Sequence, residues 1–104
     1  MPSSGGFVAV LVIDLHFPDA GSLKAKRKEL SSIKALLQRR LGTAVAEIDH
    51  HDRWQRATLT AALTGASPGA VSALADRVER FLEARNPDGV RVERIVASVE
   101  ELRA

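Results

Sequence analysis

Apolar and polar residues follow two different periods along the chain, and these periods predict four strands and two helices. Alternation at every second position between residues 7 and 17 predicts a β-strand, because successive side chains of a strand point to opposite faces. Similar patterns predict strands over residues 43–49 and 55–64. Residues 90–99 predict a last strand, in which charged residues interrupt the alternation.

The two predicted helices are marked by apolar residues at helical spacing and by capping residues. The first stripe lies within residues 23–41, where Ser22 is suited to cap the helix and Gly42 to end it. The second stripe lies within residues 71–82, after the Ser67-Pro68 pair. A serine cap followed by proline at the first helical position is a frequent start of a helix.

The resulting order of elements is βαββαβ, which predicts an α+β protein with a ferredoxin-like sandwich. In that fold, a four-stranded antiparallel sheet is covered by two helices on one face. A chain of 104 residues is sufficient for one domain with an ordinary core. We expect a single domain over residues 7–104, preceded by a flexible tail over residues 1–6.

The second face of this sheet has no helix to cover it. It is expected to carry aliphatic and hydroxyl side chains, namely Val8, Val10, Val12, Thr58 and Thr60. An exposed apolar surface of this kind is often covered by a second copy of the same chain. We therefore expect a homodimer.

Composition limits the chemistry that is available. The chain has no cysteine, and the apolar run from Phe7 to Ile13 is too short to span a membrane, which fits a protein of the cytoplasm without membrane contact. No Gly-x-Ser-x-Gly turn, glycine-rich phosphate loop or catalytic triad is recognisable. We therefore assign no catalytic residue and expect no cofactor.

Positive charge is concentrated at the first predicted helix. Residues 24–40 contain seven lysines and arginines and one glutamate, so this segment carries +6 while the whole chain carries +2. Cations in the first turns of a helix oppose the helix dipole, and a helix start surrounded by cations suits phosphate. The predicted phosphate or RNA contacts are Ser22, Lys24, Lys26, Arg27 and Lys28. The alternative is a solvated helix face with no ligand.

A polar run follows the second predicted strand and contains possible metal ligands, namely Asp49, His50, His51 and Asp52. Imidazole and carboxylate groups bind zinc, manganese or iron, and the first strand could add Asp14 or His16. Four adjacent residues converge on one ion only where the chain turns. We favour the alternative that these residues cap a turn or bond to the backbone, and we predict no metal.

Trp54 is the only tryptophan and is close to two arginines, Arg53 and Arg56. An aromatic ring beside arginines is suited to stack on an unpaired base. The alternative is that Trp54 packs against the sheet edge or a subunit interface while the arginines pair with Glu47 or the nearby aspartates. We favour packing, and we keep Arg53, Trp54 and Arg56 as candidate RNA contacts.

The segments 22–27, 46–57 and 77–81 together resemble the YlxP-like family, small bacterial proteins of undetermined function. The resemblance extends over nearly the whole chain and implies a ferredoxin-like fold. It also implies a gene often found beside genes for transcription, translation initiation and ribosome maturation, which points to RNA or the ribosome. The chain departs from the family at Ala25, where relatives often have an acidic residue, and at His51, where they often have glutamine.

Three functional hypotheses follow. The first is a non-enzymatic binding protein of the cytoplasm that contacts RNA or the ribosome through its basic first helix. The second is a dimeric protein-interaction module that uses the open sheet face. The third is a metal-dependent enzyme centred on residues 49–52.

Overall fold

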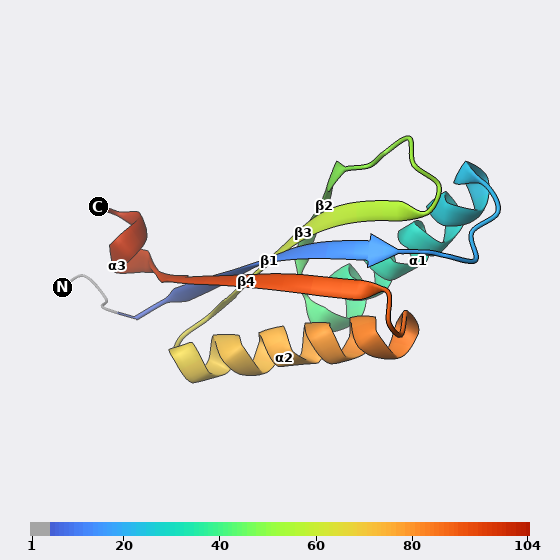
Figure 1. The fold of residues 1–104 in the computed structure, drawn as a ribbon. Helices are drawn as coiled ribbons and strands as arrows, with labels where there is room; N and C mark the ends of the chain where they lie inside the picture. The colour runs from blue at the N-terminus through green and yellow to red at the C-terminus, as the bar shows by residue number, and fades with distance from the viewer. Residues whose placement is uncertain (1–4) are drawn as a thin grey trace.

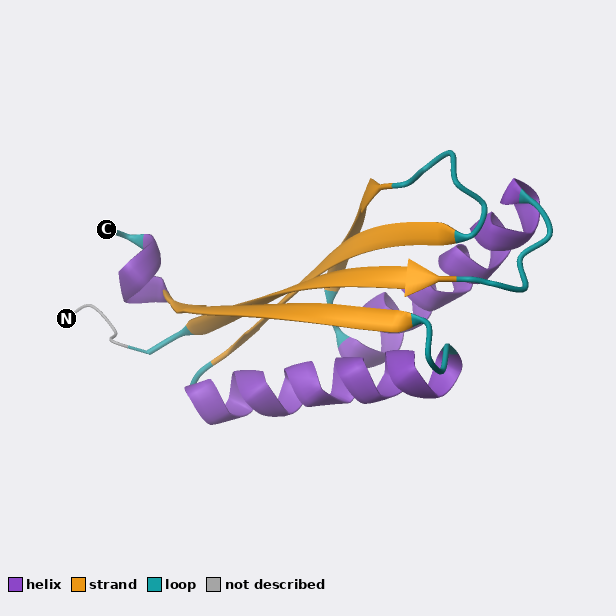
Figure 2. Ribbon diagram, viewed as in Figure 1, coloured by secondary structure: helices purple, strands orange, loops and turns teal. Residues whose placement is uncertain are grey.

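The computed structural model describes residues 5–104 and has the strand and helix order predicted from the sequence (Figure 1). The elements are β1 (Phe7–His16), α1 (Leu23–Leu41), β2 (Ala44–Asp49), β3 (Arg56–Gly65), α2 (Pro68–Arg85), β4 (Val90–Ser98) and α3 (Val99–Leu102). The four strands form one antiparallel sheet in the order β2-β3-β1-β4. Both long helices pack on one face of this sheet, so the ferredoxin-like prediction is confirmed (Figure 2).

The core lies between the sheet and the two long helices. Alternate residues of the two central strands point into it and are fully or almost fully buried, namely Ala9, Leu11, Ile13 and Leu15 of β1 and Ala57, Leu59, Ala61 and Leu63 of β3. The helices contribute residues at helical spacing, namely Leu30, Ile33 and Leu37 of α1 and Val71, Ala75, Val78 and Leu82 of α2. The apolar residues at strand spacing and those at helical spacing therefore pack against each other in one core.

The helix ends follow the capping residues of the sequence. The hydroxyl of Ser22 accepts a hydrogen bond of 3.0 Å from the backbone N–H of Ala25, and Gly42 ends α1 with a left-handed φ of 63°. At α2, the hydroxyl of Ser67 accepts from the N–H of Ala70 at 3.1 Å, and Pro68 is the first helical residue. These contacts satisfy backbone groups that a helix terminus leaves without partners.

Arg94 explains why the alternation of the last strand was difficult to recognise. It is opposite Leu11 in the sheet and therefore lies on the helix face, at a position where an apolar residue is expected. Its guanidinium donates to Asp76 at 2.9 Å and to Glu79, both on α2. A charged residue thus takes a core-facing place because α2 supplies two carboxylates.

The two ends of the described chain meet beside the last strand. The backbone N–H of Val99 donates to the carbonyl oxygen of Gly6 at 2.9 Å. The sequence assigned Gly6 to a flexible tail over residues 1–6, of which residues 1–4 are outside the described part. The short helix α3 was not predicted, although Ser98 and Glu101 form a capping box there.

Among residues 5–104, no helix is long and apolar enough to cross a membrane.

Candidate functional site

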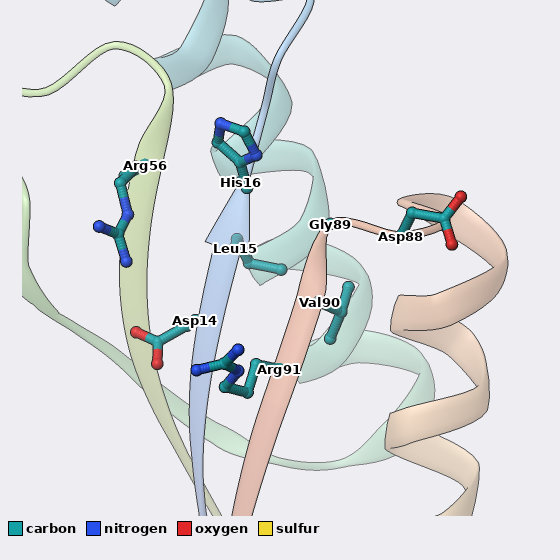
Figure 3. Close-up of a pocket in the computed structure, with 8 residues that line it drawn as sticks. All are labelled: Asp14, Leu15, His16, Arg56, Asp88, Gly89, Val90 and Arg91. Carbon is teal, nitrogen blue, oxygen red and sulfur yellow. The ribbon is translucent and has the colours of Figure 1, made fainter.

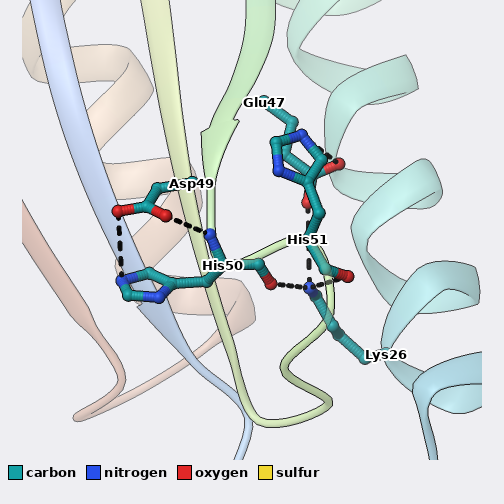
Figure 4. Close-up of polar contacts among 5 residues, drawn as sticks. All are labelled: Lys26, Glu47, Asp49, His50 and His51. Atoms are coloured by element: carbon teal, nitrogen blue, oxygen red, sulfur yellow. Dashed lines mark hydrogen bonds and ion pairs between the residues drawn. The ribbon is translucent and has the colours of Figure 1, made fainter.

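Lys26 is the largest fully buried side chain of the described residues and does not face solvent. It lies on the core-facing stripe of α1, and its Nζ donates to the carbonyl oxygen of His50 at 2.7 Å. The carbonyl oxygen of His51 is 3.5 Å away and Oε2 of Glu47 is 3.7 Å away (Figure 4). The prediction that Lys26 contacts phosphate is therefore wrong, because a buried ammonium group needs these internal acceptors.

A β-bulge places Glu47 where it can neutralise Lys26. The register of β2 against β3 shifts between Glu47 and Asp49, so that Ile48 is an extra residue in the strand. Glu47 is opposite Leu59 on the helix face, whereas Asp49 is opposite Thr58 on the open face. The bulge therefore separates two carboxylates that a regular strand would place on the same face.

The four residues 49–52 do not form a metal site. Oδ1 of Asp49 accepts from the backbone N–H of His50 at 2.7 Å, and its other oxygen faces the ring of His50 at 3.8 Å. The ring of His51 points elsewhere, toward Glu47 at 3.9 Å (Figure 4). No group of three or more histidine and acidic side chains within residues 5–104 is arranged to hold an ion.

The segment 50–53 is a turn, as the preferred interpretation of the polar run predicted. His50 has a left-handed φ of 63°, and its carbonyl oxygen accepts from the N–H of Arg53 at 3.1 Å as well as from Lys26. A non-glycine residue tolerates this φ only where its surroundings hold it, and here Asp49 and Lys26 do so. The first helix and the polar run are therefore one structural unit.

The remaining residues predicted on α1 are exposed. Lys24, Arg27 and Lys28 face solvent, and none of them forms a salt bridge with another residue in the described part of the chain. The hydroxyl of Ser22 is used as the helix cap. Three of the four predicted helix cations thus remain available to a ligand.

Arg53, Trp54 and Arg56 lie together on the surface. Half of the area of Trp54 is exposed, so its ring is not enclosed by the single chain, and packing at a subunit interface stays a prediction. The arginines do not pair with nearby carboxylates, since neither forms a salt bridge within residues 5–104. The segment is also anchored, because the N–H of Phe17 donates to the carbonyl oxygen of Gln55 at 2.8 Å.

Residues that the sequence did not connect with Trp54 line the surface next to it. A hollow of about 390 Å³ lies at the end of the open sheet face, between His16 of β1, Arg56 of β3 and Arg91 of β4 (Figure 3). A second hollow of about 380 Å³ extends from His16 and Arg56 to Trp54. Arg91 was not predicted because its contribution depends on the pairing of β1 with β4, which places it opposite Asp14.

The comparisons with known proteins agree with this fold and assign no activity to it. The family described as "Protein of unknown function (DUF503)" matches residues 8–99. The uncharacterized protein YlxP of Bacillus subtilis (strain 168) is 34% identical over 65 residues, which are 62% of this chain and 71% of that protein. The designed protein Foldit4 aligns with a TM-score of 0.56 and 13% identity over 89% of this chain and 97% of its own, a likeness of fold alone. The chain therefore belongs to the DUF503 family of proteins of unknown function, in agreement with its resemblance to the YlxP-like family.

Proposed function

We propose that the protein is a non-enzymatic binding protein of the cytoplasm that docks on RNA, either free or within the ribosome. The observation that carries this proposal is the exposed ring of Trp54 between two arginines that have no acidic partner within residues 5–104. Aromatic rings stack on unpaired bases, and arginines beside them bind the phosphates of the same strand. Stacking and phosphate binding involve no chemical reaction, so this role is non-enzymatic.

The exposed cations of α1 support the same function. Lys24, Arg27 and Lys28 lie near the start of the helix, at the end of the molecule that also carries the loop between β2 and β3 (Figure 1). Lys26 connects the two by its hydrogen bond to His50. Lys26 thus supports the surface from inside, while its three neighbours supply the charge that attracts phosphate.

The test is binding of a labelled single-stranded RNA, measured by fluorescence anisotropy over a range of salt concentrations. Replacing Lys24, Arg27 and Lys28 with alanine is expected to weaken binding and to flatten its salt dependence, because each phosphate contact contributes about −0.7 to the logarithmic slope. The matched control replaces Arg39, Arg40 and Arg77, which are also exposed, and removes the same net charge. The same pair of variants is compared for co-sedimentation with ribosomes.

Two results would contradict the proposal in different ways. Equal losses in the test and control variants would show that only net charge matters and would remove α1 from the site. Absence of RNA binding at low salt, together with absence of ribosome co-sedimentation, would reject the function as a whole.

A second candidate function is a homodimer formed through the open sheet face. This face carries partly exposed Val8, Val10 and Val12, and beside them Ile95, of which 48% is exposed. A contiguous aliphatic surface of this kind is suited to a second copy of the chain. Light scattering is expected to give twice the mass of one 11.2 kDa chain, and Val10→Glu is expected to give the mass of one chain. A single-chain mass for the unmodified protein at micromolar concentration would reject the dimer.

A further inference from the structure

The polar end of the open sheet face differs from the rest of that face. The rows centred on Val8 and Val10 present aliphatic, threonine and alanine side chains, and the row centred on Val12 adds the exposed Glu93. The next row presents Asp14 between Thr58 and Arg91. Two positions further along β1, on the same face, His16 is opposite Arg56. The hollow of about 390 Å³ is lined by Asp14, His16, Arg56 and Arg91 among others, and Figure 3 shows Asp14 on β1 between the strands that carry Arg56 and Arg91.

This hollow continues into the surface around Trp54. His16 and Arg56 line both hollows, so the two form one path from the turn after β2, across the end of β3 and β1, to the first residues of β4. Trp54 stands at one end of the path and Arg91 at the other. Arg56 lies between them because it lines both hollows, while Arg53 lines the hollow that contains Trp54. None of the three arginines has a salt bridge within the described residues.

The lining also contains hydrogen-bond acceptors, which a site for bare phosphate does not need. Oδ1 of Asp14 accepts the hydroxyl of Thr58 at 2.8 Å, which fixes this carboxylate at the floor of the hollow. Asp88, in the turn before β4, lines the same hollow. An ionised carboxylate only accepts hydrogen bonds, so a ligand must bring donors of its own. Ribose hydroxyls and the amino groups of bases are such donors, and phosphate oxygens are not.

We propose that this path binds a short segment of single-stranded RNA, with one base stacked on Trp54, phosphates at Arg53, Arg56 and Arg91, and a ribose hydroxyl or base amino group at Asp14. The inference rests on the proposed RNA function and extends its contact surface from Trp54 across the end of the open sheet face to Asp14 and Arg91. Duplex RNA does not fit this description, because its bases are already stacked on one another and cannot reach an exposed indole ring.

The experiment measures the fluorescence anisotropy of a labelled single-stranded RNA oligonucleotide bound to the protein. Four competitors are added in separate titrations, namely unlabelled single-stranded RNA, the matching duplex, single-stranded DNA and heparin. Trp54→Ala is expected to weaken binding of single-stranded RNA by about 5- to 140-fold, because stacking contributes about 1–3 kcal/mol per base and 1.4 kcal/mol is a factor of ten. Trp54→Phe retains a stacking ring and is expected to recover most of the affinity. Circular dichroism and the urea midpoint confirm that these exposed positions leave the fold intact.

Arg91→Ala tests the far end of the path, and Arg77→Ala is its control. Both arginines are exposed and neither forms a salt bridge within residues 5–104, but Arg77 lies on α2, away from the sheet face. Arg91→Ala is expected to weaken RNA binding several-fold, whereas Arg77→Ala leaves it unchanged. Asp14→Asn, which retains an acceptor and adds a donor, is expected to reduce the preference for single-stranded RNA over heparin.

The outcomes separate the inference from the function on which it rests. If RNA binding depends on the α1 cations and on Trp54 but not on Arg91 or Asp14, the path is wrong and the RNA function stands. Equal competition by heparin and RNA, with no effect of Trp54→Ala, would show a surface for any polyanion and would also overturn the path. A protein that binds no RNA at low salt contradicts both proposals.

Discussion

Lys26 donates a hydrogen bond of 2.7 Å to the carbonyl oxygen of His50, across 24 residues of sequence. This bond connects the first turns of α1 to the turn that leads to Trp54. Glu47 supplies the negative charge that the buried ammonium group needs, at 3.7 Å. Two of the three segments that carry the resemblance to the family, 22–27 and 46–57, are therefore in direct contact in the structure.

Lys26→Met is expected to destabilise the protein by about 3 kcal/mol, because it leaves Glu47 and two carbonyl oxygens without their cation. Urea unfolding measures this change. Lys28→Met is the control, since Lys28 is exposed and without a salt bridge among the described residues, and it is expected to change stability by less than about 0.5 kcal/mol. Equal stability of the two variants would show that the buried amine does not hold the turn.

Arg94 is expected to contribute about 1 kcal/mol through its contacts with α2, since its partners are partly exposed. The hydrogen bonds to Glu79 and Asp76 raise the pKa of the Arg94 guanidinium, so it remains charged at every pH where the protein is folded. Arg94→Ala measured by urea unfolding at low and high salt tests this estimate. A loss that is the same as for Arg77→Ala would contradict it.

Two glycine-to-alanine substitutions are expected to change stability in opposite directions. A β-carbon at Gly89 would lie 2.5 Å from the carbonyl oxygen of His16, in a turn whose backbone holds the start of β4. Gly89→Ala is therefore expected to cost about 1–3 kcal/mol through displaced backbone. Gly69, at the start of α2, has nothing within 4 Å of such an atom, and Gly69→Ala is expected to stabilise by about 0.5 kcal/mol. Thermal unfolding of both variants provides the comparison.

The capping box at α3 is expected to open in acid. The backbone N–H of Ser98, and then its hydroxyl, lower the pKa of Glu101 below its ordinary value. A group whose pKa is lower in the folded state stabilises that state above its unfolded pKa, and the contribution is lost as pH falls through the folded pKa. The protection factor of the Ser98 amide, which is the intrinsic exchange rate divided by the measured rate at the same pH, should therefore fall on acidification. Glu101→Gln removes the titrating carboxyl, so the protection of the Ser98 amide should no longer change with its protonation. The same pH profile in Glu101→Gln and in the unmodified protein would contradict the prediction.

The sequence predicted the elements well because their periods are local properties. It also contained the signal for the burial of Lys26, since positions 26, 30, 33 and 37 fall on one helical stripe. The prediction followed the residue type instead of the position, because lysine is seldom fully buried. A buried lysine becomes credible only when the acceptors that surround it are known.

Those acceptors depend on contacts that no local pattern shows. The bulge at Ile48 directs Glu47 toward α1, and nothing in the alternation of residues 43–49 marks it. The hollow of about 390 Å³ likewise requires the pairing of β1 with both β3 and β4, which brings His16, Arg56 and Arg91 to one end of the sheet. The sequence identified His16 and Arg56 as separate candidate residues, but it did not show that they lie together with Arg91.

Because of the bulge at Ile48, the short strand β2 directs Glu47 to the helix face and Asp49 to the open face of the sheet. A strand without the extra residue would direct Glu47 and Asp49 to the same side, where a single ammonium group would have to offset two negative charges away from water. One added amino acid avoids that excess charge. It also leaves Asp49 available to accept the hydrogen bond from the N–H of His50 that stabilises the following turn. The position of the exposed Trp54 ring therefore depends on a β-bulge in an edge strand.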